Sequence, residues 1–120
     1  MISIIYGSSR LGNTESLGQL LLKNKKHKSF KLRDFNIKHI TDMRHDDNGF
    51  LHSKDDYYTI VDEILKSDSI VFSTPLYWYG ISDLLKTFIS RFSESMRDEG
   101  LSFKEKMKGK KVYLLIVGRE

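Results

Sequence analysis

Two glycine-bearing loops contain the residues with the clearest chemical potential. The first loop follows an apolar run at residues 2–6 and reads Gly7-Ser8-Ser9-Arg10-Leu11-Gly12-Asn13-Thr14. The second loop follows an apolar run at residues 69–73 and reads Thr74-Pro75-Leu76-Tyr77-Trp78-Tyr79-Gly80. By residue type, the first loop is suited to hold a phosphate and the second to hold a flat aromatic ring.

The first loop precedes a helical pattern, and a helix N-terminus attracts anions through its free N–H groups and its dipole. Gly7 and Gly12 allow the backbone to turn tightly and to approach a ligand closely. The serine, asparagine and threonine side chains add neutral donors, and Arg10 adds a charged one. The alternative is that Asn13 or Thr14 simply caps the helix that follows.

The better-known phosphate loops have a different composition. A Walker loop needs a lysine before its last Ser or Thr, and the first loop has none. The dinucleotide fingerprint needs three glycines at fixed spacing and an acid after the second strand; Asp34 fits the acid, but the glycine spacing does not fit. The serines that follow the first strand also disfavour a response-regulator receiver, which uses paired acids to hold Mg²⁺.

The second loop carries three consecutive aromatic residues between a proline and a glycine. They cannot all enter one core, so we expect at least one of them to be exposed or to lie against a ligand. Stacking on an isoalloxazine, with loop N–H groups donating to its carbonyl edge, would use both features. The alternative is an aromatic turn packed under neighbouring loops. A phosphate and a ring at one sheet edge together indicate flavin mononucleotide, FMN.

Strand and helix patterns alternate along the chain. The sequence predicts strands at 2–6, 29–34, 69–73 and 111–117 and helices at 14–26, 55–66 and 81–97, with a long polar loop at 36–53. This alternation predicts a parallel sheet covered on both faces. Ligands of such sheets bind beyond the carboxyl ends of the strands, where both glycine loops are expected to lie.

The periodicity also predicts which side chains face inward. The apolar stripe of helix 81–97 consists of Ile81, Leu84, Leu85, Phe88, Ile89, Phe92 and Met96, whereas Arg91 and Glu94 are predicted to face away from it. Helix 14–26 has an apolar side made of Leu17, Leu20 and Leu21. The run at 111–117 is predicted to be a buried strand.

Composition predicts one soluble domain over residues 1–120. The chain is 39% hydrophobic and 30% charged, without an apolar run long enough for a bilayer or a signal-peptide pattern. It has no cysteine, which excludes disulfides and thiolate chemistry and is compatible with a cytoplasmic location. The net charge of +4 comes mainly from 23–31 and 104–111, which lack interleaved aromatics, so we expect no nucleic-acid partner.

The long polar loop contains histidines and acids, but their spacing matches no standard zinc or calcium arrangement. These residues are His39, Asp42, His45, Asp46, Asp47 and His52. We therefore predict no metal site there.

Taken together, the motifs resemble the flavodoxin-like NADPH-dependent FMN reductase family. The resemblance runs through essentially all 120 residues and rests on both loops together with Asp68, Leu85-Lys86-Thr87-Phe88-Ile89 and Arg91. It implies a three-layer α/β fold with an open parallel sheet of order 2-1-3-4, FMN as cofactor and NAD(P)H as reductant. By the resemblance, the phosphate would be held by Ser8, Arg10, Asn13 and Thr14, and the ring by Pro75, Leu76, Tyr77, Trp78 and Gly80.

The chain departs from the family pattern in two ways. Relatives with an iron–sulfur cluster have cysteines in the stretch aligned with residues 40–52, and this stretch has none, so cluster electron transfer is not expected. Family members continue beyond the fourth strand with a further strand and helices. We therefore expect a flavodoxin-like domain without its fifth strand, and a homodimer in which a second subunit covers the open edge.

The leading hypothesis is an FMN-dependent oxidoreductase. Hydride would pass from NAD(P)H through FMN to a small-molecule quinone, flavin, nitro or azo acceptor, without a catalytic acid or base from the protein. The alternative is a truncated flavodoxin-like binding module with weak or no FMN and no turnover. An electron carrier of flavodoxin type is disfavoured by the basic charge, because such carriers tend to be strongly acidic.

Overall fold

The computed structural model describes residues 1–9, 12–39, 55–76 and 80–118, and its regular elements follow the predicted alternation. In chain order they are β1 (Ile2–Tyr6), α1 (Asn13–Leu21), β2 (His27–Lys31), η1 (Leu32–Asp34), α2 (Tyr57–Lys66), β3 (Ser69–Pro75), α3 (Asp83–Ser90), α4 (Phe92–Arg97), η2 (Glu99–Leu101), α5 (Phe103–Met107) and β4 (Lys111–Val117).

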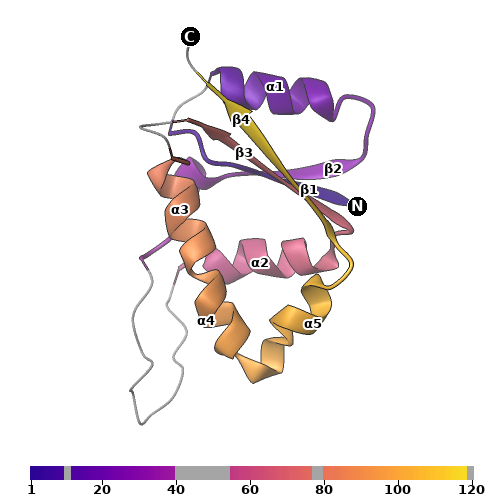
Figure 1. Cartoon of the computed structure of the whole chain (residues 1–120), viewed down its shortest axis with the longest axis vertical. Coiled ribbons are helices and arrows are strands. Elements are labelled where there is room, and N and C mark those ends of the chain that lie inside the picture. The colour runs from indigo at the N-terminus through magenta and orange to yellow at the C-terminus, as the bar shows by residue number, and fades with distance from the viewer. Residues whose placement is uncertain (10–11, 40–54, 77–79, 119–120) are drawn as a thin grey trace.

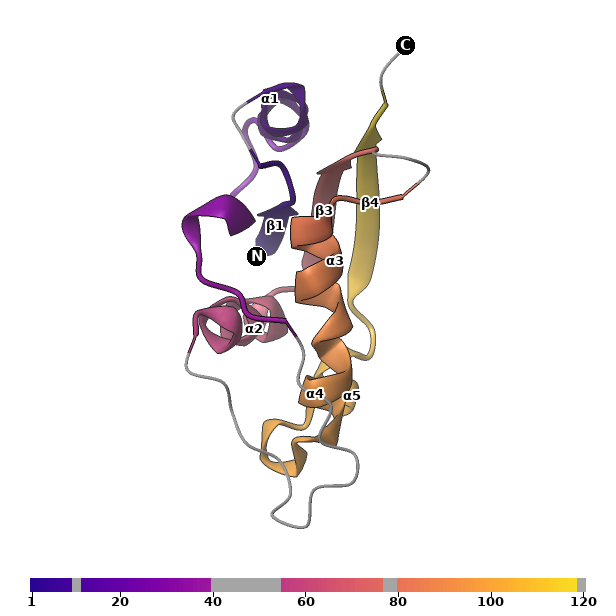
Figure 2. The ribbon, with the colours of Figure 1, turned by 90° about the vertical axis from the view of Figure 1, so that its left-hand side faces the viewer.

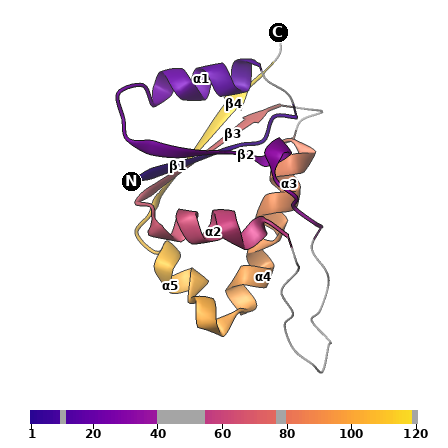
Figure 3. The ribbon, with the colours of Figure 1, turned by 180° about the vertical axis from the view of Figure 1, so that it is seen from behind.

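The strands form one parallel sheet of order β2-β1-β3-β4, as predicted. β1 and β3 are its central strands; their first residues pair, Ile2 with Ser69, and β3 continues two residues beyond Ser73, the partner of the last residue of β1, Tyr6. Helix α1 covers one face of the sheet, while α2 and the run from α3 to α5 lie on the other (Figure 1 and, from behind, Figure 3). The protein is therefore the three-layer α/β structure that the sequence predicted.

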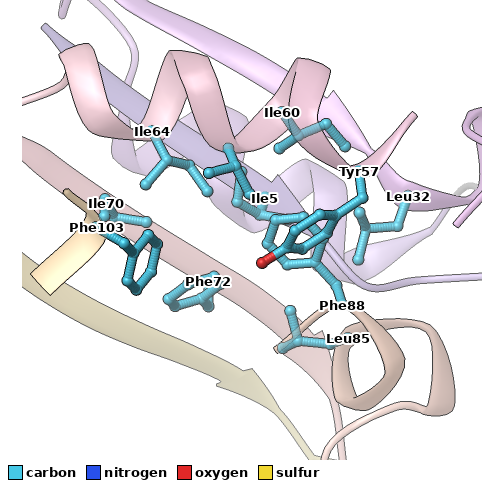
Figure 4. Packing of buried hydrophobic residues seen from close by; sticks show 11 residues of the cluster. Ile5, Leu32, Tyr57, Ile60, Ile64, Ile70, Phe72, Leu85, Phe88 and Phe103 are labelled. Carbon is cyan, nitrogen blue, oxygen red and sulfur yellow. The ribbon is translucent and has the colours of Figure 1, made fainter. Parts of the chain in front are cut away.

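The main core lies between the sheet and the α2–α3 layer (Figure 4). Side chains at alternate positions of β1 and β3 face this layer, where they meet Tyr57, Ile60, Ile64, Leu85 and Phe88. The intervening positions, Ile4, Tyr6 and Val71, form a smaller cluster with Leu22 beneath α1. The core thus holds α3, which begins directly after the second loop, firmly against the sheet.

The predicted helix at 81–97 is interrupted. Helix α3 ends at Ser90, α4 begins at Phe92, and Arg91 lies at the break with φ −78° and ψ −4°. The predicted stripe is correct for Leu85 and Phe88, which are fully buried, but wrong for Met96, which is 59% exposed. The prediction that Arg91 and Glu94 face away is wrong as well, because both are buried. Paired carboxylates on either side of the guanidinium make this burial possible, as described below.

The prediction that strand 111–117 is buried is also wrong, although its bounds are correct. β4 pairs only with β3 among the described strands, and Figure 2 shows it at the border of the molecule. Four of its apolar side chains are about half exposed, namely Val112, Tyr113, Leu114 and Ile116. The apolar run therefore predicted the position of the strand correctly, but it did not predict whether other elements cover the strand.

The other element predictions need smaller corrections. β2 begins two residues earlier than predicted, and the end of its run forms the 3₁₀ turn η1. The short helix α5 was not predicted, and no described helix is long and apolar enough to cross a membrane.

Helix α1 ends at Leu21, earlier than predicted, and its apolar side faces outward. Leu17, Leu20 and Leu21 are exposed, whereas Thr14, Glu15 and Gly18 are its buried positions. Gly18 lies directly over β1, since a Cβ there would be 2.6 Å from the Tyr6 hydroxyl and 2.9 Å from Ile4 Cδ1. Close approach of the helix to the sheet therefore requires a glycine at this position.

We predict that Gly18→Ala destabilises the fold, although alanine is the better helix former. Overpacking a buried contact costs about 1–3 kcal/mol, which exceeds the propensity gain of about 1 kcal/mol. Urea unfolding followed by circular dichroism measures the effect, with Gln19→Ala as the matched control because Gln19 is exposed on the same helix. A Gly18→Ala protein as stable as this control would contradict the packing argument.

Candidate functional site

The two glycine loops meet at the carboxyl edge of the sheet. The Gly7 N–H donates to the Ser73 carbonyl at 2.8 Å, which extends the pairing of β1 and β3 beyond β1. The Ser73 hydroxyl donates to the Thr14 carbonyl at 3.2 Å and thereby ties β3 to the first turn of α1. The predicted phosphate-binding and ring-binding segments therefore start side by side.

Any larger residue at Gly7 would displace the start of α3. A Cβ on Gly7 would lie 2.6 Å from Ser82 Oγ and 2.9 Å from Leu85 Cβ. Ser82 is the N-cap of α3, and its Oγ accepts from the Leu85 N–H at 3.2 Å. The first loop thus packs against the start of α3, and the two loops share one compact edge.

Among the described residues, no group covers the N-terminus of α1. Its N-cap is Gly12, which has no side chain to accept from the first turn, and no described atom lies within 4 Å of the position a Cβ would take. Most strand-to-helix turns place an Asp, Ser, Thr or Asn there. An anion can therefore approach the first N–H groups of α1 without displacing a capping group.

The second loop is fixed where it leaves β3. Leu76 N–H donates to the Val117 carbonyl of β4 at 3.0 Å, and Ser82 N–H donates to Thr74 Oγ1 at 3.0 Å. Thr74 in turn donates to the Pro75 carbonyl at 2.9 Å. The two described ends of the segment 74–82 are therefore joined to each other, and the first of them is also bonded to β4.

The predicted site residues fall into three groups. Ser8 and Thr14 are buried, at 5% exposure each, while Asn13 is exposed at the open end of α1. Pro75 and Gly80 are half-buried, and Leu76 is 43% exposed. The remaining predicted residues, Arg10, Tyr77 and Trp78, lie outside the described residues, so their assignment to the site stays a prediction.

A buried ionic cluster lies on the α2–α3 side of the sheet. Arg91 is fully buried and forms ion pairs with Asp55 and with Glu94, the latter at 2.9 Å. Its guanidinium also lies 4.1 Å from the centre of the Tyr57 ring. Burial lowers the pKa of Arg91, but the hydrogen bonds to Glu94 and Asp55 raise it by more, so the guanidinium stays charged.

Arg91 also joins segments that are distant in sequence. Its Nη1 donates to the Lys38 carbonyl at 3.4 Å, and the Lys38 N–H donates to Asp55 Oδ2 at 2.8 Å. Two residues before Lys38, the Asn36 N–H donates to the Asp56 carboxylate at 2.7 Å, and the Asp56 N–H donates to the Asn36 carbonyl at 2.9 Å. Residues 36–38 are therefore tied to the start of α2.

A second buried acid connects α1 with the end of β2. Glu15 is 2% exposed and pairs with Arg33 and, at 3.7 Å, with Lys31. Sequence periodicity did not indicate that Glu15 and Arg91 are buried. The only local signal was the three-residue separation of Arg91 and Glu94, which indicates an ion pair on a helix but not its burial.

Comparisons with known proteins agree with this geometry. Residues 2–118 match the family described by the flavodoxin-like fold. The chain is 37% identical over 119 residues to a Bacillus subtilis (strain 168) protein that carries the provisional name NAD(P)H-dependent FMN-containing oxidoreductase YwqN. The match covers 98% of this chain and 66% of that protein, so the chain spans about two thirds of its relative's length.

Solved structures give the same result. The Trp repressor binding protein from Bacillus subtilis is 30% identical with a TM-score of 0.78, over 100% of this chain and 64% of that one. An FMN-dependent NADH-azoreductase from Bacillus anthracis str. Ames Ancestor, solved with FMN, shares the fold at 12% identity and a TM-score of 0.64, over 98% and 68% of the two chains.

The chain belongs to the flavodoxin-like family, as its motifs predicted. The predicted order of the strands, 2-1-3-4, is confirmed at the same time.

We predict that Arg91→Met destabilises the protein by about 3–5 kcal/mol, because two buried carboxylates lose their counter-charge. Urea unfolding at low and high salt measures this, and the loss is expected to be nearly independent of salt because the cluster is shielded from ions. Arg97→Met, an exposed change on α4, is the control and is expected to cost less than about 1 kcal/mol. An equal loss of unfolding free energy in Arg91→Met and Arg97→Met would show that the buried ion pairs do not stabilise the fold.

Proposed function

We propose that this chain is an FMN-binding, NAD(P)H-dependent oxidoreductase that reduces quinone, flavin, nitro or azo compounds. The observation that carries the proposal is the meeting of the two loops, joined by the bonds from Gly7 to Ser73 and from Ser73 to Thr14. A phosphate subsite and a ring subsite must be neighbours to bind one mononucleotide. YwqN, whose name describes such an activity, supports the same proposal.

The residues present fit the phosphate of FMN. The first turn of α1 has no side-chain cap at Gly12 and offers N–H donors, and no atom of the described residues lies within 4 Å of a Cβ placed on Gly12. Asn13 is exposed at this turn, Thr14 belongs to the same turn, and Ser8 lies in the loop that precedes it in sequence. These groups are neutral dipoles that can be desolvated at a lower cost than a lysine or arginine, while the helix dipole supplies the attraction for the anion.

The residues around the second loop fit the role of a rigid mount. Thr74 and Ser82 hold the two ends of the loop together, and the loop is anchored to β4 through Leu76 N–H. Pro75, Leu76, Tyr77, Trp78 and Gly80 would frame the flavin ring. The flavin supplies hydride and electron chemistry when bound, so the chain's own task is to orient the ring and to exclude water from one side of it.

Substitutions of Gly12 test this proposal, because helix capping and phosphate binding respond to them in opposite directions. We expect Gly12→Asp to stabilise the fold by up to about 1 kcal/mol, since a carboxylate at the N-cap accepts from the first turn. The same carboxylate would repel the FMN phosphate and lower FMN affinity by at least about tenfold. Thermal unfolding and titration of flavin fluorescence measure the two effects.

The neutral variant Gly12→Ser separates charge from bulk. It caps the helix as well but carries no charge, so its FMN affinity is expected to lie between those of the wild type and Gly12→Asp. Steady-state oxidation of NADPH with a quinone acceptor completes the test. If the wild-type protein fails to bind FMN, or if Gly12→Asp binds it as tightly as the wild type does, the phosphate subsite is wrongly assigned.

We further propose that the 120-residue chain forms a homodimer through β4. Within the described residues, β4 offers an unpaired edge and about half-exposed apolar side chains on both of its faces. An exposed apolar edge strand is a template for pairing with another chain. A second copy supplies a strand of the same composition, so that both edges would be satisfied by one symmetric contact.

Light scattering after size-exclusion chromatography tests this proposal. The wild-type protein is expected at twice the mass of one chain, and Leu114→Lys at the mass of one chain, because a charge in the contact is desolvated on association. Met96→Lys is the control, since Met96 is similarly exposed on α4, away from β4. A monomeric wild-type protein, or a Leu114→Lys dimer, would rule out this interface.

A further inference from the structure

A pocket separate from the two loops lies between α3 and the segment that follows η1. Its volume is about 540 Å³, within the range of small-molecule sites. One wall is the exposed side of α3, and the other is formed by the segment 36–39 (Figure 3 shows η1 beside α3). The pocket begins at Leu32 and Asp83, which follow β2 and the second loop respectively, so it opens at the same sheet edge as those loops.

The wall at 36–39 is held in place by the buried ionic cluster. The backbone of Asn36 and Lys38 bonds to Asp56 and Asp55, as described above, and Arg91 holds the Lys38 carbonyl. The intervening side chains, Ile37 and His39, line the pocket. The backbone groups of Asn36 and Lys38 thus fix this segment, and the side chains of the residues that follow each of them face the pocket.

The second wall of the pocket is one face of helix α3. Asp83, Thr87 and Ser90 recur at helical spacing and line the pocket, with Leu84 and Lys86 beside them. Leu85 and Phe88 face the core on the opposite side of the same helix. Because α3 is fixed by its buried side and by the Ser82 cap, the backbone positions that carry these polar side chains are fixed as well.

The chemistry of the lining favours a nucleotide. Ile37 and Leu84 are partly exposed and form an apolar floor suited to a planar base, with the buried Leu32 behind them. Lys86 and His39 offer cationic or donor groups for a phosphate, and Asp83 can accept from a ribose hydroxyl. An uncharged quinone carries no anionic group for Lys86, so these residues favour a phosphorylated adenosine over such an acceptor.

We infer that this pocket binds the phosphate-bearing adenosine half of NAD(P)H. The inference rests on the proposed function, which requires a reduced nicotinamide nucleotide near the flavin. It adds the position at which the non-reacting half of that nucleotide is held, with Lys86 as the phosphate ligand and Ile37 and Leu84 as the base platform. The pocket and the second loop are joined by α3, so the reacting half would extend toward that loop.

The test uses 2′,5′-ADP, which carries the adenosine phosphates but no redox-active ring. Isothermal titration of the 120-residue protein is expected to detect binding, and Lys86→Met is expected to weaken it by about tenfold, the effect of losing one charge-assisted contact. The matched control Lys23→Met removes an exposed lysine after α1, outside the pocket, and is expected to change the affinity by less than about twofold. Circular dichroism verifies that all variants are folded.

Measuring FMN and 2′,5′-ADP binding in both the Gly12→Asp and the Lys86→Met variants shows whether the nucleotide binds in this pocket. The same comparison distinguishes the pocket assignment from the proposed function. Gly12→Asp should weaken FMN without affecting 2′,5′-ADP, and Lys86→Met should do the reverse. Binding of 2′,5′-ADP that depends on Lys86 in a protein without FMN affinity would support the pocket and overturn the proposed function. Absence of 2′,5′-ADP binding, displacement of 2′,5′-ADP by FMN, or equal affinities of Lys86→Met and Lys23→Met would overturn the pocket assignment.

Discussion

The hydrogen bond between the Gly7 N–H and the Ser73 carbonyl is the contact on which the arrangement of the candidate site depends. It continues the parallel pairing of β1 and β3 past the end of β1, so the two loops must begin side by side. Gly7 has no room for a Cβ against Ser82 and Leu85, and this close packing sets the distance between the first loop and α3. The edge is therefore specified by backbone geometry more than by any side chain in the loops.

Much of this edge could be predicted from the sequence, because its causes are local. The apolar runs at 2–6 and 111–117 gave strands with the observed bounds, and the alternation with helices gave the parallel sheet. The position of both loops at the carboxyl edge follows from that topology alone. The roles of Arg10 and of Tyr77 to Tyr79 remain predictions, since these residues lie outside the described part of the chain.

The features that could not be predicted depend on contacts between distant segments. Hydrophobic periodicity assigns a charged residue to the solvent side, yet Arg91 is buried because Asp55, far away in sequence, supplies a counter-charge. The exposure of β4 likewise depends on segments outside the strand itself. An apolar run predicts a strand from its own residues, whereas burial depends on a neighbour that the run does not encode.

Helix α3 begins near the sheet edge that carries the two glycine loops and forms one wall of the pocket. Both of its ends are fixed by contacts with other segments. At about 12 Å in length, it is too short to be stable alone, so its position must come from tertiary contacts. Its N-terminus is held by the Ser82 cap and the bond from Ser82 to Thr74, and its C-terminus runs into Arg91 at the centre of the ionic cluster. Because Arg91 also holds Lys38, one residue sets the separation of both pocket walls. A buried charge cluster costs desolvation energy that a hydrophobic replacement would avoid, but it fixes three segments in one geometry, as a binding pocket beside a cofactor edge requires.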